Sequence, residues 1–355
     1  MSPNASAAPD ALFVPFASGE LAWPGGGDVA FLGARDCAGL NAAREVAAWH
    51  LEQPFKPRAD ALARAGWRVA DSLHDGATHA AFPLVLVLPP RQRDAARALF
   101  ARALSIAAPG GIVVASIANN EGARSGEADL RRLAGSVHGL SKHKCRVFWT
   151  SPGHAPDSEL LAEWAALDAI RPIDDGRFVS RPGLFSWDRI DPASALLAAR
   201  LPATLAGRIA DLGAGFGYLA SEVLRRCPRV AAIDLYEADA RALEPARINA
   251  ARAAAGRIDE ARIDVRWHDV TAGLPRHYDA IVSNPPFHQG RADEPQLGRA
   301  FISAAAAALE PDGHLWMVAN RHLAYEATLA AHFADLRVVV VRDGFKVIEA
   351  SGVRA

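Results

Sequence analysis

Short apolar segments alternate with longer segments of helical spacing through the second half of the chain. The runs at 208–212 and 230–234 are expected to form strands, and the segments at 218–227 and 238–255 have the spacing of helices. The same pattern predicts further strands at 263–267, 280–283, 314–318 and 336–341, and one helix at 298–309. This alternation is typical of a mostly parallel sheet with helices on both faces, which binds ligands beyond the carboxyl ends of its strands.

The first half of the chain repeats the pattern of the second. The sequence F-P-L-V-L-V-L-P-P at 82–90 parallels Y-D-A-I-V-S-N-P-P at 278–286. Likewise, V-A-F-L-G-A-R-D-C at 29–37 parallels I-A-D-L-G-A-G-F-G at 209–217. In both halves a helical segment, a turn with glycine and a strand ending in Ala-Asn follow. The repeat predicts an α/β protein of two tandem Rossmann-like domains that arose by internal duplication.

The two copies differ at the positions where a ligand would bind. The pairs, first copy before second, are Phe31 and Asp211, Arg35 and Gly215, Cys37 and Gly217, and Leu88 and Asn284. Each replacement removes a polar group or fills space beside the backbone, so we expect the first copy to be degenerate and to serve as a scaffold or recognition module. Pro, Gly and Asp gather at 171–176, which predicts a degenerate domain at 1–174 and a functional domain at 175–355.

Composition restricts the class of protein. A formal net charge of −1 argues against coating nucleic acid by bulk charge, so such a partner must meet a local patch. Cys37, Cys145 and Cys227 have no paired spacing, which favours neither a metal site nor a disulfide framework. No apolar run approaches the ~20 residues of a membrane span, and M-S-P-N-A-S-A-A-P-D lacks the pattern of a secretory signal. We therefore expect a cytoplasmic protein with no membrane contact.

Three glycines, Gly213, Gly215 and Gly217, lie at a predicted strand-to-helix turn in A-D-L-G-A-G-F-G. Glycine tolerates positive φ and lets a ligand approach the backbone, and the helix that follows offers free amides. The spacing differs from the dinucleotide pattern G-x-G-x-x-G, and Asp211 in the strand end would repel a pyrophosphate. The same carboxylate could bond the ammonium or an amide at the amino-acid end of S-adenosylmethionine.

Two further carboxylates follow the next predicted strands. Asp234 is expected to end its strand about 20 residues beyond the glycines, where a carboxylate accepts hydrogen bonds from ribose hydroxyls. Asp269 follows the strand at 263–267 and is either an acceptor for an adenine amino group or an exposed turn aspartate. Both positions favour a cofactor that contains a nucleoside.

The strand at 280–283 runs into S-N-P-P-F-H-Q-G. Pro285 and Pro286 remove two backbone donors and fix φ at about −65°, so the chain leaves the sheet rigidly and presents Asn284 at the strand's carboxyl end. Such a segment is either a site or an ordinary strand stop. The first copy has V-L-P-P-R here, with the prolines but without the amide and the ring, so Asn284 and Phe287 are the candidates for chemistry.

Together, D-L-G-A-G-F-G, the acid at Asp234 and S-N-P-P-F-H resemble a class I S-adenosylmethionine-dependent methyltransferase. N-P-P-F followed by His288 and Gly290, with a degenerate first copy, is similar to the bacterial ribosomal RNA guanine-N2 methyltransferases, above all the small subunit methyltransferase C family. R-P-G-L-F-S-W-D-R-I-D at 181–191 and F-K-V-I-E at 345–349 also resemble that family. The resemblance implies two tandem class I methyltransferase domains, the first degenerate. It also implies methyl transfer to N2 of a guanine in 16S rRNA, within the small ribosomal subunit or its precursor, by a monomer.

The resemblance assigns the reaction to Asn284, Pro285, Pro286 and Phe287. The guanine amine would donate hydrogen bonds to the Asn284 side-chain oxygen and the Pro285 carbonyl, which would aim its lone pair at the methyl group. Phe287 would stack on the flipped base. Because the nitrogen becomes cationic as the methyl arrives, no strong base is needed, and His288 is expected beside the loop or against RNA.

Basic residues of the first domain are expected to hold the RNA. Arginine and lysine outnumber acids around residues 91–146, and Lys142, Lys144 and Arg146 are the preferred phosphate contacts. An ordinary solvated charged face is the alternative.

Other functions remain open at this point. They are guanine-N2 methylation of 23S rRNA, methylation of another planar amine (protein glutamine or adenine), and a non-catalytic role in RNA binding or assembly.

Overall fold

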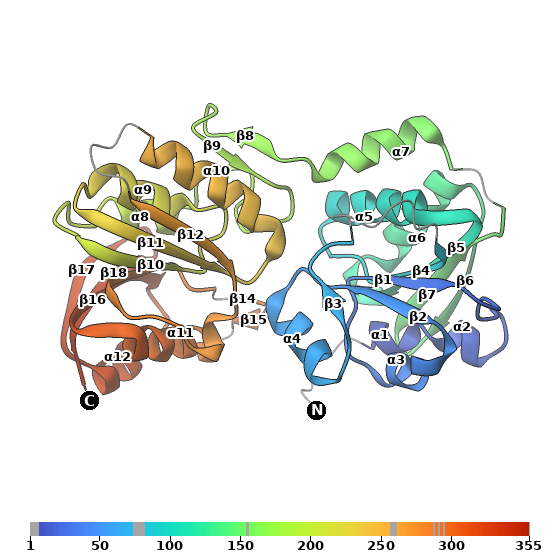
Figure 1. The fold of residues 1–355 in the computed structure, drawn as a ribbon, viewed down its shortest axis with the longest axis horizontal. Helices are drawn as coiled ribbons and strands as arrows, with labels where there is room; N and C mark the ends of the chain where they lie inside the picture. The colour runs from blue at the N-terminus through green and yellow to red at the C-terminus, as the bar shows by residue number, and fades with distance from the viewer. Residues whose placement is uncertain are drawn as a thin grey trace. The chain divides into compact units, whose positions relative to one another are not determined.

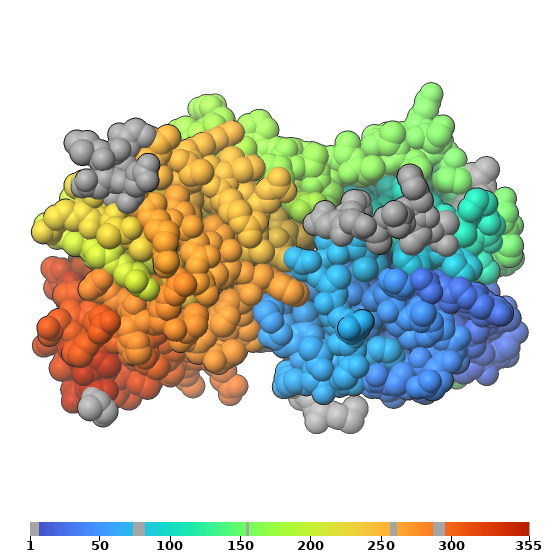
Figure 2. Space-filling view, viewed as in Figure 1, coloured from blue at the N-terminus to red at the C-terminus, as the bar shows by residue number. Residues whose placement is uncertain are grey.

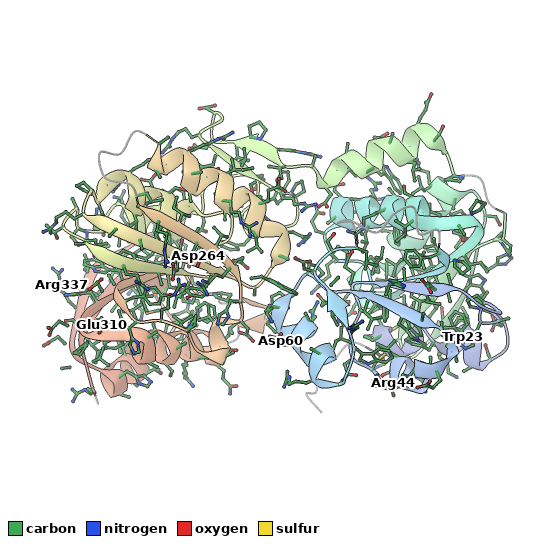
Figure 3. All side chains as sticks on the ribbon, in the orientation of Figure 1. Trp23, Arg44, Asp60, Asp264, Glu310 and Arg337 are labelled. Carbon is green, nitrogen blue, oxygen red and sulfur yellow. The ribbon has the colours of Figure 1, made fainter. Side chains whose placement is uncertain are left out.

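Two seven-stranded sheets organise the chain, one in each of two units, Met1–Ala169 and Ile170–Ala355. The computed structural model describes residues 7–73, 82–153, 156–255, 261–286, 288–289, 292–293 and 295–354. In each unit, helices cover both faces of the sheet (Figure 1). Figure 2 shows the same face with every atom drawn, in the colours of Figure 1, and Figure 3 shows side chains projecting from both faces of both sheets.

The sheet of the first unit has the strand order β3-β2-β1-β4-β5-β7-β6. Its strands are β1 (Asp28–Leu32), β2 (Ala48–Glu52), β3 (Val69–Ala70), β4 (Phe82–Val87), β5 (Ala107–Ala118), β6 (Val137–Lys142) and β7 (Cys145–Thr150). The helices are α1 (Ala8–Ala11), α2 (Val14–Ala17), α3 (Ala38–Ala42), α4 (Lys56–Arg64), α5 (Arg93–Ile106), α6 (Ala123–Ala134) and α7 (Ser158–Ala165).

The sheet of the second unit has the strand order β12-β11-β10-β13-β16-β18-β17. Its strands are β10 (Gly207–Leu212), β11 (Val230–Glu237), β12 (Arg262–Trp267), β13 (Tyr278–Ser283), β16 (Leu309–Asn320), β17 (Phe333–Arg342) and β18 (Phe345–Val353). The helices are α8 (Pro192–Ala198), α9 (Tyr218–Arg226), α10 (Leu243–Ala254), α11 (Pro295–Ala308) and α12 (Glu326–His332). Two hairpins complete the unit, β8 (Arg171–Ile173) with β9 (Phe178–Ser180), and β14 (His288–Gln289) with β15 (Ala292–Asp293).

The two sheets have the same topology, which confirms the predicted duplication. Strand for strand, the order of the first sheet reproduces that of the second, including the one strand, β7 or β18, that runs antiparallel to both neighbours. The register agrees as well, because Leu32 pairs with Val87 as Leu212 pairs with Ser283. Residues compared between the copies by sequence alone are therefore structurally equivalent.

Two apolar layers hold the second unit together. On one face of the sheet, α8, α9 and α10 bury Leu197, Val223 and Ala250, and on the other α11 and α12 bury Ile302 and Leu329. Burying a side chain of leucine or isoleucine size contributes about 1.5–3 kcal/mol. No helix in the described parts of the chain is both long and apolar enough to span a membrane.

Some features differ from the sequence expectations. The apolar pattern does not predict α8 and α12, because each has only seven residues, and two turns give little periodicity. The boundary expected at Asp174 falls in the turn between β8 and β9, where Asp174 and Asp175 have positive φ. The β8–β9 hairpin belongs to the second unit.

Candidate active site at the carboxyl edge of the second sheet

The glycine loop and Asn284 lie side by side at the carboxyl edge of the second sheet. β10 and β13 are neighbours, and each leads directly into one of these segments. A Cβ added at Gly213 would lie 3.9 Å from the backbone oxygen of Asn284. The predicted convergence of the two motifs is therefore present in the structure.

The three loop glycines have different roles, although all have positive φ. A Cβ at Gly217 would lie 3.1 Å from Ala246 Cα, so this glycine permits close packing of the loop on α10. A Cβ at Gly215 would meet nothing within 4 Å. Space beside the backbone of Gly215 is what a cofactor needs to approach the loop.

Asp211 is fully buried at the end of β10. Its Oδ2 accepts a hydrogen bond from the backbone N–H of Ala220 in α9 at 2.9 Å, and its Oδ1 has no partner among the described residues. Burial raises the pKa of Asp211 to about 7, and the Ala220 bond opposes that shift only in part. A cationic ligand group at Oδ1 would favour the ionised form.

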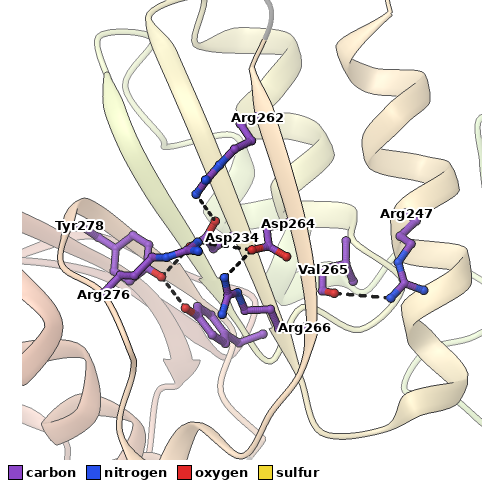
Figure 4. A network of polar contacts seen from close by, with 9 residues as sticks. Asp234, Arg247, Arg262, Asp264, Val265, Arg266, Arg276 and Tyr278 are labelled. Carbon is purple, nitrogen blue, oxygen red and sulfur yellow. Dashed lines mark hydrogen bonds and ion pairs between the residues drawn. The ribbon is translucent and has the colours of Figure 1, made fainter.

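Asp234 does not end its strand, and this prediction is wrong. β11 continues to Glu237, and Asp234 is fully buried within the strand. Its Oδ2 accepts hydrogen bonds of 2.8 Å from both Arg276 and Tyr278 (Figure 4). Oδ2 is thus engaged away from the edge where the glycine loop lies, while Oδ1 is 3.9 Å from Arg262 and has no hydrogen-bond partner among the described residues.

Glu237 occupies the strand end that the sequence interpretation gave to Asp234. Its Oε2 accepts a hydrogen bond from the backbone N–H of Gly215 at 2.7 Å, and its Oε1 accepts one from Asp239 N–H at 2.8 Å. The residue as a whole is half-buried, and burial of the carboxylate raises its pKa. The sequence carries one signal for this position, a second acid shortly after Asp234 in D-L-Y-E.

The first unit shows how the equivalent position changed. In the first unit, Ala34 N–H donates to the carbonyl of Glu52. In the second unit, Ala214 N–H donates to the carbonyl of Tyr236 in the same way. Gln53 and Glu237, which each follow the accepting residue, are therefore counterparts. Gln53 is buried, and its Nε2 donates to the carbonyl of Ala34 at 2.6 Å. The Gln53 amide is therefore hydrogen-bonded to the loop that corresponds to the glycine loop of the second unit. Nearby Arg35 is partly buried, and burial lowers the pKa of its guanidinium.

Asp269 follows β12 and caps the short helix η5 (Val270–Ala272). Its Oδ1 accepts hydrogen bonds from Thr271 N–H at 2.9 Å and Thr271 Oγ1 at 2.7 Å. The capping bonds hold the carboxylate at the same edge of the sheet as Glu237. Its contact with an adenine amino group stays a prediction.

Asn284 is held by its amide nitrogen while its oxygen is left without a partner. Nδ2 donates to Asp191 Oδ2 at 3.0 Å and to Ser194 Oγ at 2.9 Å. Oδ1 is buried and has no hydrogen-bond partner in the described part of the chain. Pro285 is buried and Pro286 is exposed. Phe287 lies outside the described residues, and His288 is described only as part of β14.

Four arginines of the predicted basic surface pair with two buried acids. Arg146 and Arg131 form ion pairs with buried Glu127, and Arg93 and Arg97 pair with buried Asp129. Pairing with an internal carboxylate neutralises much of their charge. The role of Arg146 as a phosphate contact stays a prediction.

Lys142 and Lys144 remain exposed at the tip of the β6–β7 hairpin. Lys144 and His143 form the turn and have φ of 58° and 53°, in the left-handed region. The equivalent turn of the second unit uses Asp343 and Gly344.

Comparison with known proteins agrees with this geometry. Residues 175–349 match the family model of the methyltransferase small domain. A ribosomal RNA small subunit methyltransferase C of Pseudomonas aeruginosa is 38% identical over 197 residues, which are 55% of this chain and 56% of that protein. The matched part thus spans little more than half of that relative. A protein of the same name from Pseudomonas paraeruginosa is 33% identical over 273 residues, 76% of this chain and 79% of that protein.

One solved structure has the same two-unit fold. It is the T. thermophilus 16S rRNA N2 G1207 methyltransferase (RsmC) in complex with AdoMet and guanosine, with a TM-score of 0.77 at 24% identity, covering 99% of this chain and 93% of that one. At this identity the match supports the fold. Together with the P. paraeruginosa relative, which the chain covers over most of its length, it leads to one conclusion: the chain belongs to the ribosomal RNA small subunit methyltransferase C family.

Proposed function

We propose that the protein transfers a methyl group from S-adenosylmethionine to the exocyclic N2 of a guanine in 16S rRNA. The observation that carries the proposal is Asn284 Oδ1, a buried acceptor without a partner among the described residues, directly beside the glycine loop. An unpaired buried acceptor costs about 1–3 kcal/mol, which a donor from a ligand would recover. Guanine N2 carries two N–H donors, and one of them suits this oxygen.

The residues around the glycine loop fit the cofactor. The sulfonium of S-adenosylmethionine supplies the electrophilic methyl group. Asp211 Oδ1 would accept from its ammonium group, and the open side of Gly215 leaves room beside the backbone. Glu237 replaces Asp234 in our assignment of the ribose contact, because Glu237 lies at the strand end and already touches the loop. Asp269 remains the candidate for the adenine amino group.

The substrate amine would be oriented by Asn284 and by the carbonyl of Pro285. Two hydrogen-bond acceptors on a conjugated amine favour pyramidal nitrogen and direct its lone pair. Because Asn284 Oδ1 is shielded from water in the free protein, substrate binding must expose it. Phe287 would stack on the flipped guanine, an interaction worth about 1–3 kcal/mol.

RNA would be gripped by the β6–β7 hairpin of the first unit. Lysine at a left-handed position costs about 1–2 kcal/mol relative to glycine, and the second unit has glycine at the equivalent position. Strain of this kind persists at functional positions. Lys142 and Lys144 are accordingly our preferred phosphate contacts, with His288 as a further candidate.

Relatives support the choice of substrate. The T. thermophilus neighbour binds AdoMet and guanosine, and the curated relatives are named for the RNA of the small subunit. We infer that this protein acts on the small subunit or its precursor as a monomer, which light scattering during gel filtration would test.

Methyl transfer from labelled S-adenosylmethionine to isolated RNAs tests the proposal. The substrates are 16S and 23S rRNA, each free and within its subunit, followed by mapping of the methylated nucleotide. We expect a single N2-methylguanine in 16S rRNA. Label in 23S rRNA, in adenine or in RNA-depleted protein would reassign the substrate, and failure to bind S-adenosylmethionine would favour a non-catalytic RNA-binding role.

A further inference from the structure

A carboxylate from a distant part of the chain holds the amide of Asn284. Asp191 lies 93 residues before Asn284 and is the N-cap of α8. Its Oδ2 accepts from Ser194 N–H at 2.8 Å, which is the capping bond, and from Asn284 Nδ2 at 3.0 Å. The same oxygen therefore caps α8 and accepts a hydrogen bond from the Asn284 amide.

Ser194 makes the second contact to the same nitrogen. Its Oγ lies 2.9 Å from Asn284 Nδ2, and the serine is buried in the first turn of α8. Both hydrogens of the amide thus have acceptors. A flipped amide would place Asn284 Oδ1 against the Asp191 carboxylate, where two acceptors would repel each other. The contacts therefore fix which end of the amide faces away from α8.

We propose that Asp191, assisted by Ser194, is a positioning residue that sets the Asn284 amide so that Oδ1 faces the substrate amine. The inference rests on the proposed function and adds the residues that set the orientation. Asp191 acts through Asn284 and touches neither substrate nor cofactor. Its negative charge also polarises the amide toward Oδ1, which makes that oxygen a stronger acceptor as charge develops on the amine.

Helix capping alone does not account for this arrangement. Serine is as good an N-cap as aspartate, so a capping role does not require the longer side chain. Asp157 caps α7 in the first unit through a 3.0 Å bond from Leu160 N–H. It provides a matched control, because the same substitution there changes a cap and nothing at the site.

The test compares Asp191→Ser, Asp191→Asn, Ser194→Ala and the control Asp157→Ser. Serine at 191 keeps the cap but is too short to reach Asn284, so kcat should fall by up to ~100-fold, as misplaced groups do, with unchanged affinity for S-adenosylmethionine. Asparagine at 191 keeps an oxygen that can accept both bonds and should retain far more activity. Ser194→Ala, which removes one of the two acceptors, should have an intermediate kcat. Asp157→Ser should leave kcat unchanged, and it should lower Tm less than Asp191→Ser, which also deprives the buried Asn284 Nδ2 of an acceptor.

A second readout follows the amide itself. Protein labelled with 15N-asparagine shows the Asn284 side-chain NH2 resonances, which Asn284→Ala assigns. Asp191→Ser should shift these resonances and speed hydrogen exchange at Nδ2, and Asp157→Ser should not. Wild-type kcat together with unshifted resonances in Asp191→Ser would overturn the proposal, as would an activity loss fully explained by a lower folded fraction. If no RNA is methylated by the wild type but the resonances shift as expected, the positioning contact stands and the proposed reaction fails.

Discussion

Replacing Glu237 by glutamine removes one charge from the end of β11 and keeps the size of the side chain. In the free protein the two carboxylate oxygens accept from Gly215 N–H at 2.7 Å and Asp239 N–H at 2.8 Å. A glutamine can keep only one of these bonds, because its Nε2 is a donor. Gln53 in the first unit shows the alternative, an amide that donates to the carbonyl of its own loop. We expect the variant to turn toward the Ala214 carbonyl in the same way.

The expected loss follows from the kind of hydrogen bond removed. Hydrogen bonds to charged groups contribute about 1.5–3 kcal/mol, so S-adenosylmethionine should bind roughly 10- to 150-fold more weakly. Because burial raises the pKa of Glu237, the wild type and the variant should be compared at several pH values. Titration calorimetry with S-adenosylmethionine and S-adenosylhomocysteine measures the affinity, and urea unfolding measures the stability.

Asp234→Asn is the matched control on the same strand. Asp234 pairs with Arg276 and Tyr278 inside the sheet, so its loss should lower the free energy of unfolding and leave the cofactor affinity of the folded protein unchanged. The reverse pattern, weak binding in Asp234→Asn and wild-type binding in Glu237→Gln, would refute the assignment of the ribose contact.

Three further predictions concern the reaction, the RNA and pH. Asn284→Ala should lower kcat by about 10²–10³ in the methylation assay with unchanged calorimetric affinity for the cofactor; weakened binding with normal turnover would contradict its role. Changing both Lys142 and Lys144 to alanine should weaken RNA binding and reduce the slope of log K against log salt by about 1 per lost phosphate contact. Arg146→Ala, in contrast, should mainly lower the free energy of unfolding because it leaves Glu127 without one of its ion pairs, and an unchanged salt slope in the lysine variant would exclude the hairpin. Burial raises the pKa of Asp211 to about 7, so a bound ammonium must displace its proton at lower pH, and cofactor affinity should rise between about pH 6 and 8, by at most tenfold per unit. Since the native state holds that proton more tightly than the unfolded state, the free energy of unfolding should also fall as pH rises from about 4 to about 7. Asp211→Asn should show neither dependence, and a wild type that shows neither would contradict the contact.

The repeat and the two motifs at the sheet edge could be predicted because they are local patterns. The glycine loop and N-P-P each follow a predicted strand, and the topology then brings Gly213 and Asn284 together. The end of β11 could not be predicted in the same way. A strand buried on both faces shows no alternation, and Asp234 looks like a terminal acid because its partners, Arg276 and Tyr278, are more than 40 residues away.

Long-range pairing also hides the ion pairs of the first unit from sequence inspection. Glu127 and Asp129 are buried in α6, and each forms ion pairs with two arginines. A count of charges in the sequence cannot show which of them are neutralised by an internal partner. The contact between Asp191 and Asn284 escapes sequence inspection for the same reason, although the D-P start of α8 is a recognisable cap signal.

The closure of Gln53 onto its loop has a consequence for the history of this chain. Once the amide donated to Ala34 and a side chain occupied the Arg35 position, a single substitution could no longer restore a cofactor site in the first unit. Arg35→Gly would leave a void, and Gln53→Glu would set a carboxylate against a carbonyl. Each step back is unfavourable until the other has been taken. The two positions therefore constrain each other through hydrogen bonding and packing, and changes elsewhere on the surface of the first unit leave this constraint intact.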